Sequence, residues 1–551
     1  MSNPRPPLDR RAAVIGLATV VAANVLHLSG ASIILDPLLS MEPFYIEMAQ
    51  QPVSSILRQD PAWGPLYAMW LKPLVTMLGD PLAVYIANVY CLSIGVSVMI
   101  YLYLLLLTRR AAVGAGAALV FLVCDLNVPL LSKVGAFALM VMLVGFAVSE
   151  LLPRGARRTA AAAAGVLLAA YARPEVYPAA ILLWLATLWL AAREAGEVGG
   201  SILLWPAGGL VAVVMLASCI GIPLLSGRLM LAFREHFAWN WSRWHNTSPD
   251  ALAAWQQAFG TAQTALQAVQ NNPAAIAHHL SENLIGTLSF LAATTFRHYP
   301  FLAPATNPEL VWGETLLVSA ALFGSLILVA ARASLRHRMF DRYGHLLLPF
   351  AAVALCSLGA AVVVFPLAHY LVIPGVLLML TGTLAVALIV PAERGGSAAP
   401  RALAALVCLA AVPKPYVLPS AYEVTGAPFK AKIAVARTVT DTVGLVRSLH
   451  LPVPVQVLTF TDGVGELLGT GFHEIKIWQK GTQPLSAYLR DNDVGVIISL
   501  GPGQQSVMAN DREWNRFESA HEAAGFARVV VPNHEAVRLY VRTALMGTGG
   551  G

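Results

Sequence analysis

Apolar segments of membrane-spanning length recur through most of the chain. Every second connection between these segments is short and rich in arginine. Lysine and arginine near the ends of membrane spans stay on the cytoplasmic side, so this alternation predicts an orientation. The remaining connections, two of which are long and polar, are then expected to face outward. The basic connections contain Arg109 and Arg110, Arg154 to Arg158, Arg193, Arg332 to Arg342, and Arg394 to Arg401.

The composition agrees with a membrane protein. Hydrophobic residues make up 57% of the chain and charged residues only 12%, which lies outside the range of soluble globular domains. The net charge of +6 comes from loop arginines, and no basic block with interleaved aromatics is present, so nucleic acid is not an expected partner. The five cysteines show neither a CxxC pair nor a zinc spacing, so no disulfide framework or metal–thiolate site is expected.

Eleven segments are candidates for membrane spans, which need about 20 apolar residues each. The first is too long for a signal peptide and has no clear cleavage site, so it is expected to remain as a span. The segments cover residues 12–35, 81–107, 111–130, 134–152, 159–172, 177–192, 202–225, 311–331, 344–366, 369–391 and 401–416. The expected fold is a polytopic α-helical membrane protein with about 11 transmembrane helices.

The fifth and sixth segments are short, and residues 159–192 might be taken for one long helix interrupted by Arg173 and Glu175. A single span there would place the Arg332 to Arg342 cluster outside, against the positive-inside rule. Two short spans that meet at an outward Arg173-Pro174-Glu175 corner keep the alternation, and proline suits a helix boundary.

The chain is predicted to have two domains. Residues 1–416 form the transmembrane domain, with outer loops at 36–80 and 226–310, and residues 417–551 form a soluble periplasmic domain. Strands at 453–460, 474–478, 494–500 and 536–541 alternate with helices at 464–468, 486–490 and 513–524, which favours a small α/β sandwich. An odd number of crossings places this domain outside.

The first outer loop carries the candidate catalytic acids Glu42, Asp36 and Asp60. A carboxylate at the mouth of a helix bundle can accept a proton from an incoming hydroxyl or amine. It can also hold a divalent cation against a phosphate leaving group. The structural alternative is a solvated loop whose acids cap helices.

These motifs, taken together, resemble the GT-C superfamily of integral-membrane glycosyltransferases. They are an acid followed by Tyr45 after the first span, a proline-rich stretch ending in Leu66-Tyr67, the Arg173-Pro174-Glu175 corner, the large outer loop and the outer α/β tail. The protein O-mannosyltransferases and the aminoarabinose transferases of lipid A are members of that superfamily.

The resemblance implies a sugar donor on a polyprenyl-phosphate carrier at the outer face, with an acid of the first outer loop as base or metal ligand. Met41-Glu42 occupies the place of the usual acidic pair, so only one acid is present. Glu42 is therefore the implied base, and the sequence does not require a divalent cation. Another departure is His369-Tyr370, where the superfamily often has Arg-Tyr.

Several outer residues suit a lipid-linked phosphate. Lys133 and Arg173 are isolated cations near the membrane surface, and arginine offers a bidentate fork, although cations at this depth also snorkel to headgroups. Glu175 is expected either to serve the site or to pair with Arg173. His369 is expected either to donate to a phosphate oxygen or to bond a carbonyl at a helix start. The candidate substrate-binding residues are Arg173, Lys133, Arg234, His236, His369, Tyr45 and Tyr370.

The long outer loop begins with a predicted helix over 228–245. Helical spacing places Phe233, Phe237 and Trp241 on one stripe, which favours a helix at the membrane interface over a sugar-stacking surface. Residues 251–291 are expected to form one or two amphipathic helices, with His278 and His279 at the surface.

The predicted function is transfer of a sugar from a polyprenyl-phosphate donor to a lipid, glycan or protein acceptor at the outer face of a bacterial inner membrane. An O-antigen-ligase or polymerase-like enzyme without metal is one alternative. A lipid or glycan transporter is another, but charges deep in the spans would be expected for it. A purely structural membrane anchor is the remaining alternative. Membrane lipids are expected partners in every case.

Overall fold

The structure is a computed structural model, and it describes residues 8–28, 42–127, 133–198, 204–246, 251–294, 308–366, 368–390, 427–460, 463–480, 483–500 and 512–546. The chain divides into two compact units. The bundle unit comprises residues 1–29, 53–69 and 90–417. The tail unit comprises residues 30–52, 70–89 and 418–551, so it joins the C-terminal domain to parts of the first outer loop.

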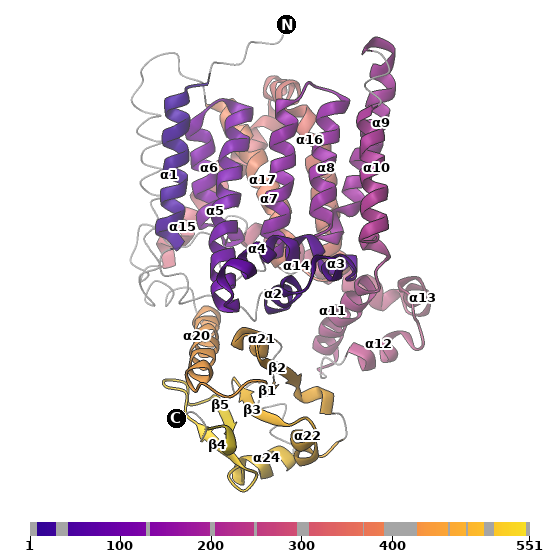
Figure 1. Ribbon diagram of the computed structural model, residues 1–551. Coiled ribbons are helices and arrows are strands. Elements are labelled where there is room, and N and C mark those ends of the chain that lie inside the picture. Colours follow the sequence, from indigo (N-terminus) through magenta and orange to yellow (C-terminus); the bar gives the residue numbers. More distant parts are fainter. Residues whose placement is uncertain are drawn as a thin grey trace. The chain divides into compact units, whose positions relative to one another are not determined.

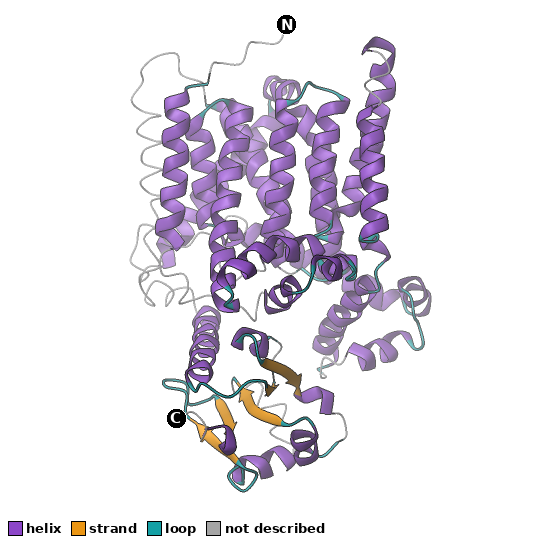
Figure 2. Ribbon diagram, viewed as in Figure 1, coloured by secondary structure: helices purple, strands orange, loops and turns teal. Residues whose placement is uncertain are grey.

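Long helices that run roughly side by side make up the bundle unit (Figures 1 and 2). An apolar helix suits a bilayer because each backbone N–H and C=O finds its partner within the same segment. These helices are α1 (Arg10–Leu28), α5 (Pro81–Thr108, whose first nine residues belong to the tail unit), α6 (Ala111–Val123), α7 (Lys133–Leu151), α8 (Ala156–Ala170), α9 (Tyr177–Val198), α10 (Leu204–Cys219), α15 (Pro308–Ala331), α16 (Ala333–Val363) and α17 (Ala368–Ile389).

Seven helical stretches in the described part of the chain are long and apolar enough to cross a membrane. They are Arg10–Leu28, Pro81–Thr108, Lys133–Leu151, Pro174–Ala195, Trp205–His245, Ala333–Val363 and Tyr370–Ile389. Two further helices, Ala111–Leu122 and Ser319–Ala331, are apolar but shorter. The prediction of a helical membrane protein is confirmed, whereas the number of about eleven spans is not. The predicted span at 401–416 lies outside the described residues.

The predicted division of residues 159–192 into two helices is confirmed. α8 ends at Ala170, Pro174 begins the 3-10 turn η4 (Pro174–Val176), and α9 begins at Tyr177. Proline produces this boundary because it has no N–H to donate and disfavours helical geometry in the residue before it. α8 packs along both α7 and α9.

Successive helices of the bundle unit run in alternate directions, so their connections gather at two ends (Figure 1). We call the end with the α5–α6, α7–α8 and α15–α16 connections the basic end, and the other the loop end. At the basic end Arg110 donates hydrogen bonds of 2.9 Å to the carbonyls of Ala387 and Val390, which close the end of α17. The basic residues on which the topology prediction depends thus also join helices.

A buried ionic cluster joins three helices near the basic end. Glu150, in the last turn of α7, has a fully buried side chain. One of its oxygens lies 3.4 Å from Nη1 of Arg158 on α8, and the other lies 2.5 Å from Nε2 of His345 on α16. A buried charge needs such partners, because the surrounding medium cannot solvate it.

The backbones of α7 and α8 approach closely at a pair of glycines. A Cβ atom on Gly145 would lie 2.6 Å from Cα of Gly165, and one on Gly165 would lie 2.7 Å from Cα of Gly145. Both neighbours are backbone atoms, which cannot move aside as a side chain can. Small residues at helix contacts are typical of membrane bundles, where close packing replaces the hydrophobic effect.

Replacing Gly145 by alanine should separate α7 from α8 and destabilise the protein by about 1–3 kcal/mol, the usual cost of overpacking. Thermal unfolding of the detergent-purified protein measures this as a lower midpoint. Gly116→Ala in α6 is the matched control, because a Cβ there meets open space. Equal midpoints for the two variants would contradict the close approach.

Shorter helices connect the spans. The part of the first outer loop that the structure describes contains α2 (Glu42–Gln50), α3 (Val53–Leu57), η2 (Pro61–Trp63) and α4 (Pro65–Leu78), and later connections contain η3 (Asp125–Asn127) and η6 (Pro223–Leu225). The long outer loop contains α11 (Arg228–His245), α12 (Ala251–Phe259), α13 (Ala265–Asn271) and α14 (Pro273–Thr294). The helix predicted at 228–245 is confirmed. Three helices follow it rather than one or two, because Thr264 and Pro273 begin new helices.

The tail unit contains a five-stranded sheet in the order β2-β1-β3-β5-β4 (Figure 2). β1 pairs in parallel with β2 and β3, and β5 pairs antiparallel with β3 and β4. The strands are β1 (Val455–Thr459), β2 (Phe472–Lys476), β3 (Val494–Ser499), β4 (Phe526–Val529) and β5 (Arg538–Arg542), and the helices are α20 (Ala427–Ser448), α21 (Val464–Leu468), η7 (Ile477–Lys480), α22 (Leu485–Asp491), α24 (Arg512–Ser519) and α25 (Thr543–Met546).

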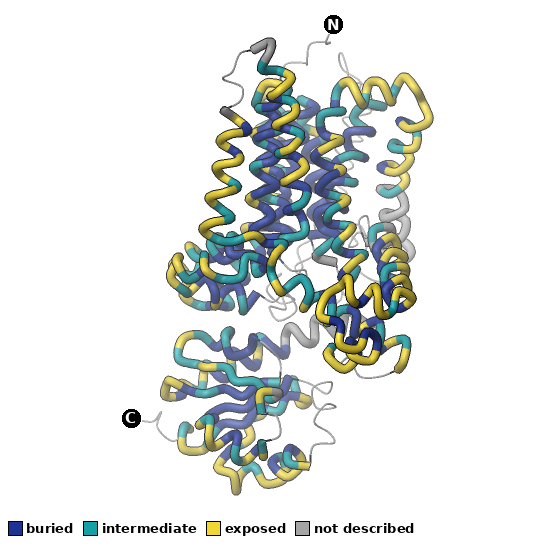
Figure 3. The backbone as a smooth tube through the Cα atoms, turned by 90° about the vertical axis from the view of Figure 1, so that its right-hand side faces the viewer, coloured by how far each residue is buried: buried dark blue, intermediate teal, exposed yellow. Residues whose placement is uncertain are grey.

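Each face of this sheet has its own apolar core, because successive strand residues point to opposite sides. Val457 and Val496 pack with α20 and α21, whereas Leu458 and Ile497 pack with α22 and α24. Both cores are buried (Figure 3). The predicted α/β tail is confirmed. The sequence pattern did not predict α20 or the short edge strand β4.

Glu474 on β2 closes the turn between β1 and α21. Its carboxyl group accepts hydrogen bonds from the Thr459 hydroxyl and from the Gly463 N–H (3.1 Å), and it lies 3.1 Å from Nζ of Lys476. Burial, and then the adjacent Glu466 carboxylate, raise the pKa of Glu474 to about 8. Thr459 and Lys476 favour its charged form but do not outweigh these two effects.

The stability of the tail should therefore fall as the pH rises. The pKa of this carboxyl group is higher in the folded than in the unfolded state, so the group stabilises the fold most at a pH below its unfolded pKa of 4.5. This contribution is lost as the pH rises through the folded pKa of about 8. Calorimetry of the full chain in detergent should show the transition of the tail moving to lower temperature over this range. Glu474→Gln should make the unfolding temperature of the tail less dependent on pH. Glu522→Gln, at an exposed site, should leave the pH dependence unchanged. A profile in Glu474→Gln as steep as in the native chain would contradict the raised pKa.

Candidate functional site

The corner between α8 and α9 holds Arg173 at the loop end of the bundle unit. The residue is extended because a proline follows it. Its side chain is 8% exposed, and Nε donates a hydrogen bond of 2.6 Å to Oε1 of Glu175. The guanidinium carbon lies 4.7 Å from the ring centre of Tyr370 at the start of α17. The structure thus brings together two predicted substrate-binding residues, Arg173 and Tyr370, and Glu175 pairs with Arg173.

This corner is suited to binding an anion. Arginine stays protonated even when it is buried, because its guanidinium group delocalises the positive charge. The carboxylate of Glu175 and the face of Tyr370 partly replace the water that the guanidinium has lost. The planar fork of a guanidinium matches a phosphate group, which it can bind through two parallel hydrogen bonds.

The loop at residues 60–64 packs against the corner. Asp60 caps η2 by accepting a hydrogen bond of 2.9 Å from the N–H of Ala62, so its carboxylate serves as a helix cap. Gly64 has φ 70°, and a Cβ atom there would lie 3.0 Å from the carbonyl oxygen of Ala172. The left-handed conformation and the close approach both require glycine at this position.

Three contacts join residues 221–228 to the same region. The hydroxyl of Tyr171 donates to the carbonyl of Gly221 at 3.1 Å. Arg228 donates to the carbonyl of Ala62 at 2.7 Å, and its guanidinium lies 3.4 Å from the ring centre of Trp63. The residues are far apart in the sequence, so no local spacing signals these contacts.

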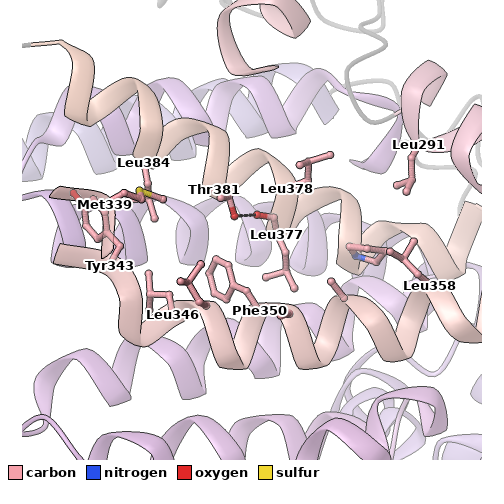
Figure 4. A pocket seen from close by; sticks show the side chains of 14 residues that line it. Leu291, Met339, Tyr343, Leu346, Phe350, Leu358, Leu377, Leu378, Thr381 and Leu384 are labelled. Carbon is pink, nitrogen blue, oxygen red and sulfur yellow. Dashed lines mark hydrogen bonds between the residues drawn. The ribbon is translucent and has the colours of Figure 1, made fainter. Parts of the chain in front are cut away.

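An apolar groove of about 310 Å³ runs between α14, α16 and α17 (Figure 4). Leucine side chains make up half of its lining, and the polar groups are those of Tyr343 and Thr381. Its lining on α16 extends from Met339 to Leu358, about 28 Å at 1.5 Å per residue. This length is close to the thickness of about 30 Å of the hydrocarbon core of a bilayer. Each long wall contains an internal proline, Pro349 in α16 and Pro374 in α17.

The groove and the Arg173 corner are neighbours. Groove-lining residues of α17 recur at helical spacing from Pro374 through Thr381 to Leu384. Tyr370 lies one turn before Pro374 on the same face, since residues four apart are neighbours along a helix. The guanidinium that contacts the Tyr370 ring therefore lies beside the loop end of the groove.

Arg234 takes part in the packing of α11 against α12, whereas the ring of His236 contacts Trp239 of its own helix and Phe365 after α16. Arg234 donates to the carbonyl of Gln263 at 3.0 Å, and its guanidinium lies 5.1 Å from the ring centre of Trp255. Nδ1 of His236 lies 2.7 Å from the carbonyl of Ala232. The described contacts of both residues are packing contacts with neighbouring side chains and carbonyls.

The predicted aromatic stripe of α11 also faces protein. Phe233 and Phe237 are buried against Trp255 and Phe259 of α12. The interpretation as an interfacial helix is therefore wrong for these two residues, because a second helix covers them. Trp239 is 47% exposed and remains compatible with an interfacial position.

The surface position predicted for His279 is wrong, whereas His278 is exposed as predicted. Nε2 of His279 lies 3.1 Å from the carbonyl of Val363, and Asn283 donates to the carbonyl of Val362 at 3.0 Å. These contacts satisfy carbonyls at the end of α16, which have no partner within that helix. Burial lowers the pKa of His279 in spite of the contacts with these carbonyls, which keeps the ring neutral.

The other predicted site residues are dispersed. Glu42 and Tyr45 lie on α2 in the tail unit, and both are buried. Lys133 is the first residue of α7 and is 2% exposed. Asp36 and the side chain of His369 lie outside the described residues.

Among the described residues, no group of three or more histidine, cysteine, aspartate or glutamate side chains is placed to hold a metal ion. No protein-family model matches the chain, and no curated protein matches it. Its function is therefore inferred from the chemistry of its own residues.

Proposed function

We propose that the chain is a membrane glycosyltransferase that moves a sugar from a polyprenyl-phosphate carrier to a lipid, glycan or protein acceptor. The observation that carries this proposal is the Arg173 corner beside the loop end of a groove with the length of the hydrocarbon core. A polyprenyl phosphate has the complementary form, a long apolar chain that ends in an anion. The groove accepts the chain, and Arg173 binds the phosphate.

The reaction is a displacement at the anomeric carbon. The acceptor hydroxyl loses its proton to Glu42, its oxygen forms the new glycosidic bond, and the bond from the anomeric carbon to the phosphate oxygen breaks. The electron pair leaves with the phosphate as negative charge.

The proposed orientation places the basic end in the cytoplasm. With eleven crossings of a bacterial inner membrane, this orientation gives a cytoplasmic N-terminus and a periplasmic C-terminal domain.

Glu42→Gln should lower kcat by about 100-fold or more, because glutamine has the same shape but accepts no proton. The measurement is sugar transfer in proteoliposomes supplied with polyprenyl-phosphate sugars and a membrane extract as acceptor. Glu47→Gln is the matched control on the exposed face of the same helix. Full activity in Glu42→Gln would remove Glu42 from the mechanism.

Arg173→Lys should weaken binding of polyprenyl phosphate by about tenfold or more, because lysine keeps the charge but lacks the planar fork. Binding of polyprenyl phosphate to the purified protein measures this directly. Arg243→Lys is the control, because that arginine is 61% exposed and pairs with Glu282 in the α11–α14 cluster. Equal affinity in Arg173→Lys and the native chain would contradict the phosphate site.

A further inference from the structure

The helix that carries Glu42 is held at its C-terminal end by a lysine of α4. Nζ of Lys72 donates hydrogen bonds to the carbonyls of Ala49 (3.1 Å) and Gln51 (2.6 Å), where α2 ends. A cation at this end satisfies carbonyls that have no partner within the helix and complements the helix dipole.

An arginine of the C-terminal domain performs the equivalent task for α21. Nε of Arg447 donates to the carbonyl of Leu468 at 3.1 Å, and Nη2 donates to the carbonyl of Leu467. Nη2 also donates to Oδ1 of Asp80 at 2.6 Å. Arg447 therefore closes the end of α21 and joins it to the connection between α4 and α5.

Asp80 is itself fixed by the start of α5. Oδ1 accepts a hydrogen bond of 3.1 Å from the N–H of Leu82, as an N-cap residue does. Partial burial tends to raise the pKa of Asp80, but the hydrogen bond and charge of Arg447, with the N–H groups of Leu82 and Ala83, outweigh burial and lower it. Asp80 is therefore charged at neutral pH, and it presents a fixed anion to Arg447.

These contacts form a closed ring within the tail unit, because α2 packs against α21. From α2 the ring passes through Lys72 to α4, along the chain to Asp80, through Arg447 to α21, and back to α2. Segments from two ends of the sequence therefore hold α2. A C-terminal domain that acted independently would show no such bonds to the first outer loop.

We infer that Arg447 and Lys72 are positioning residues that fix α2, so that the C-terminal domain forms part of the support of the catalytic site. The catalytic half of this inference rests on the proposed role of Glu42. The structural half, that the C-terminal domain holds α2, does not depend on it.

The strength of the ring comes from several bonds acting together. The Arg447–Asp80 pair is 29% and 41% exposed, and an ion pair with that exposure contributes little by itself. Arg447 additionally donates hydrogen bonds to two carbonyls of α21. Replacing it with glutamine would remove the charge and most of these hydrogen bonds at once. Arg538, which pairs with Glu518 at 3.2 Å and is similarly exposed, offers a matched control in the same domain.

Hydrogen exchange of the full-length chain in detergent tests the structural half. Arg447→Gln and Lys72→Gln should each accelerate exchange of the amides of α2 by about tenfold or more, since exchange reports local opening. Arg538→Gln should leave the exchange rates of α2 unchanged. In the double variant Arg447→Gln/Asp80→Asn, the amides of α2 should exchange no faster than in Arg447→Gln alone, because the two residues share one contact. Unchanged exchange of α2 in both Arg447→Gln and Lys72→Gln would overturn the inference.

The pH dependence of kcat tests the catalytic half. If Glu42 is the base, displacement of α2 by Arg447→Gln should move the acid limb of the profile as well as lower its height. Loss of folded protein alone lowers the height without moving the limb, so that outcome would refute a positioning role. If Glu42→Gln is fully active while Arg447→Gln loosens α2, the proposed base is wrong and the support of α2 by the tail stands.

Discussion

The hydrocarbon core offers no hydrogen-bond partner to a peptide group, and this constraint determines most of the bundle. Each segment must bond its own backbone, so helices form, and charges are displaced to their ends. Attraction between apolar side chains is weak in lipid, so the helices associate through contact of their backbones, as at Gly145 and Gly165. Polar chemistry is then concentrated in the connections, where Arg173, Glu175 and Tyr370 meet.

The features that the sequence predicted are those with local causes. Pro174 ends one helix and begins the next turn by its own geometry, and the alternating basic connections follow from the cost of moving charge through a bilayer. The strands of the tail were also predicted, because their apolar runs lie between turn residues. At the candidate site, Glu175 pairs with Arg173, which was one of the two alternatives that the sequence left open.

The features that the sequence did not predict depend on contacts between distant segments. The spacing of apolar residues in 228–245 predicts a helix. Nothing in that spacing indicates that α12 covers Phe237 or that the guanidinium of Arg228 lies over the ring of Trp63. His279 of α14 is buried because it contacts the end of α16, and the sequence of α14 alone does not indicate that contact. The same reason accounts for the tail unit, whose bond between Asp80 and Arg447 joins residues separated by most of the chain. Composition placed α2 with the membrane domain, whereas the compact unit that contains it also contains the C-terminal sheet.

The two internal prolines of the groove walls have a mechanical consequence. Proline contributes no N–H to the helical ladder and makes the helix bend at that position. Pro349 stands in α16 and Pro374 in α17, so each of the two long walls has a break in its hydrogen-bond ladder. Bending at these two points would change the width of the groove without breaking the caps that Asn283 and Arg110 place on the helix ends. Under the function that we propose, this bending would let an isoprenoid chain enter sideways from the lipid between the same two helices.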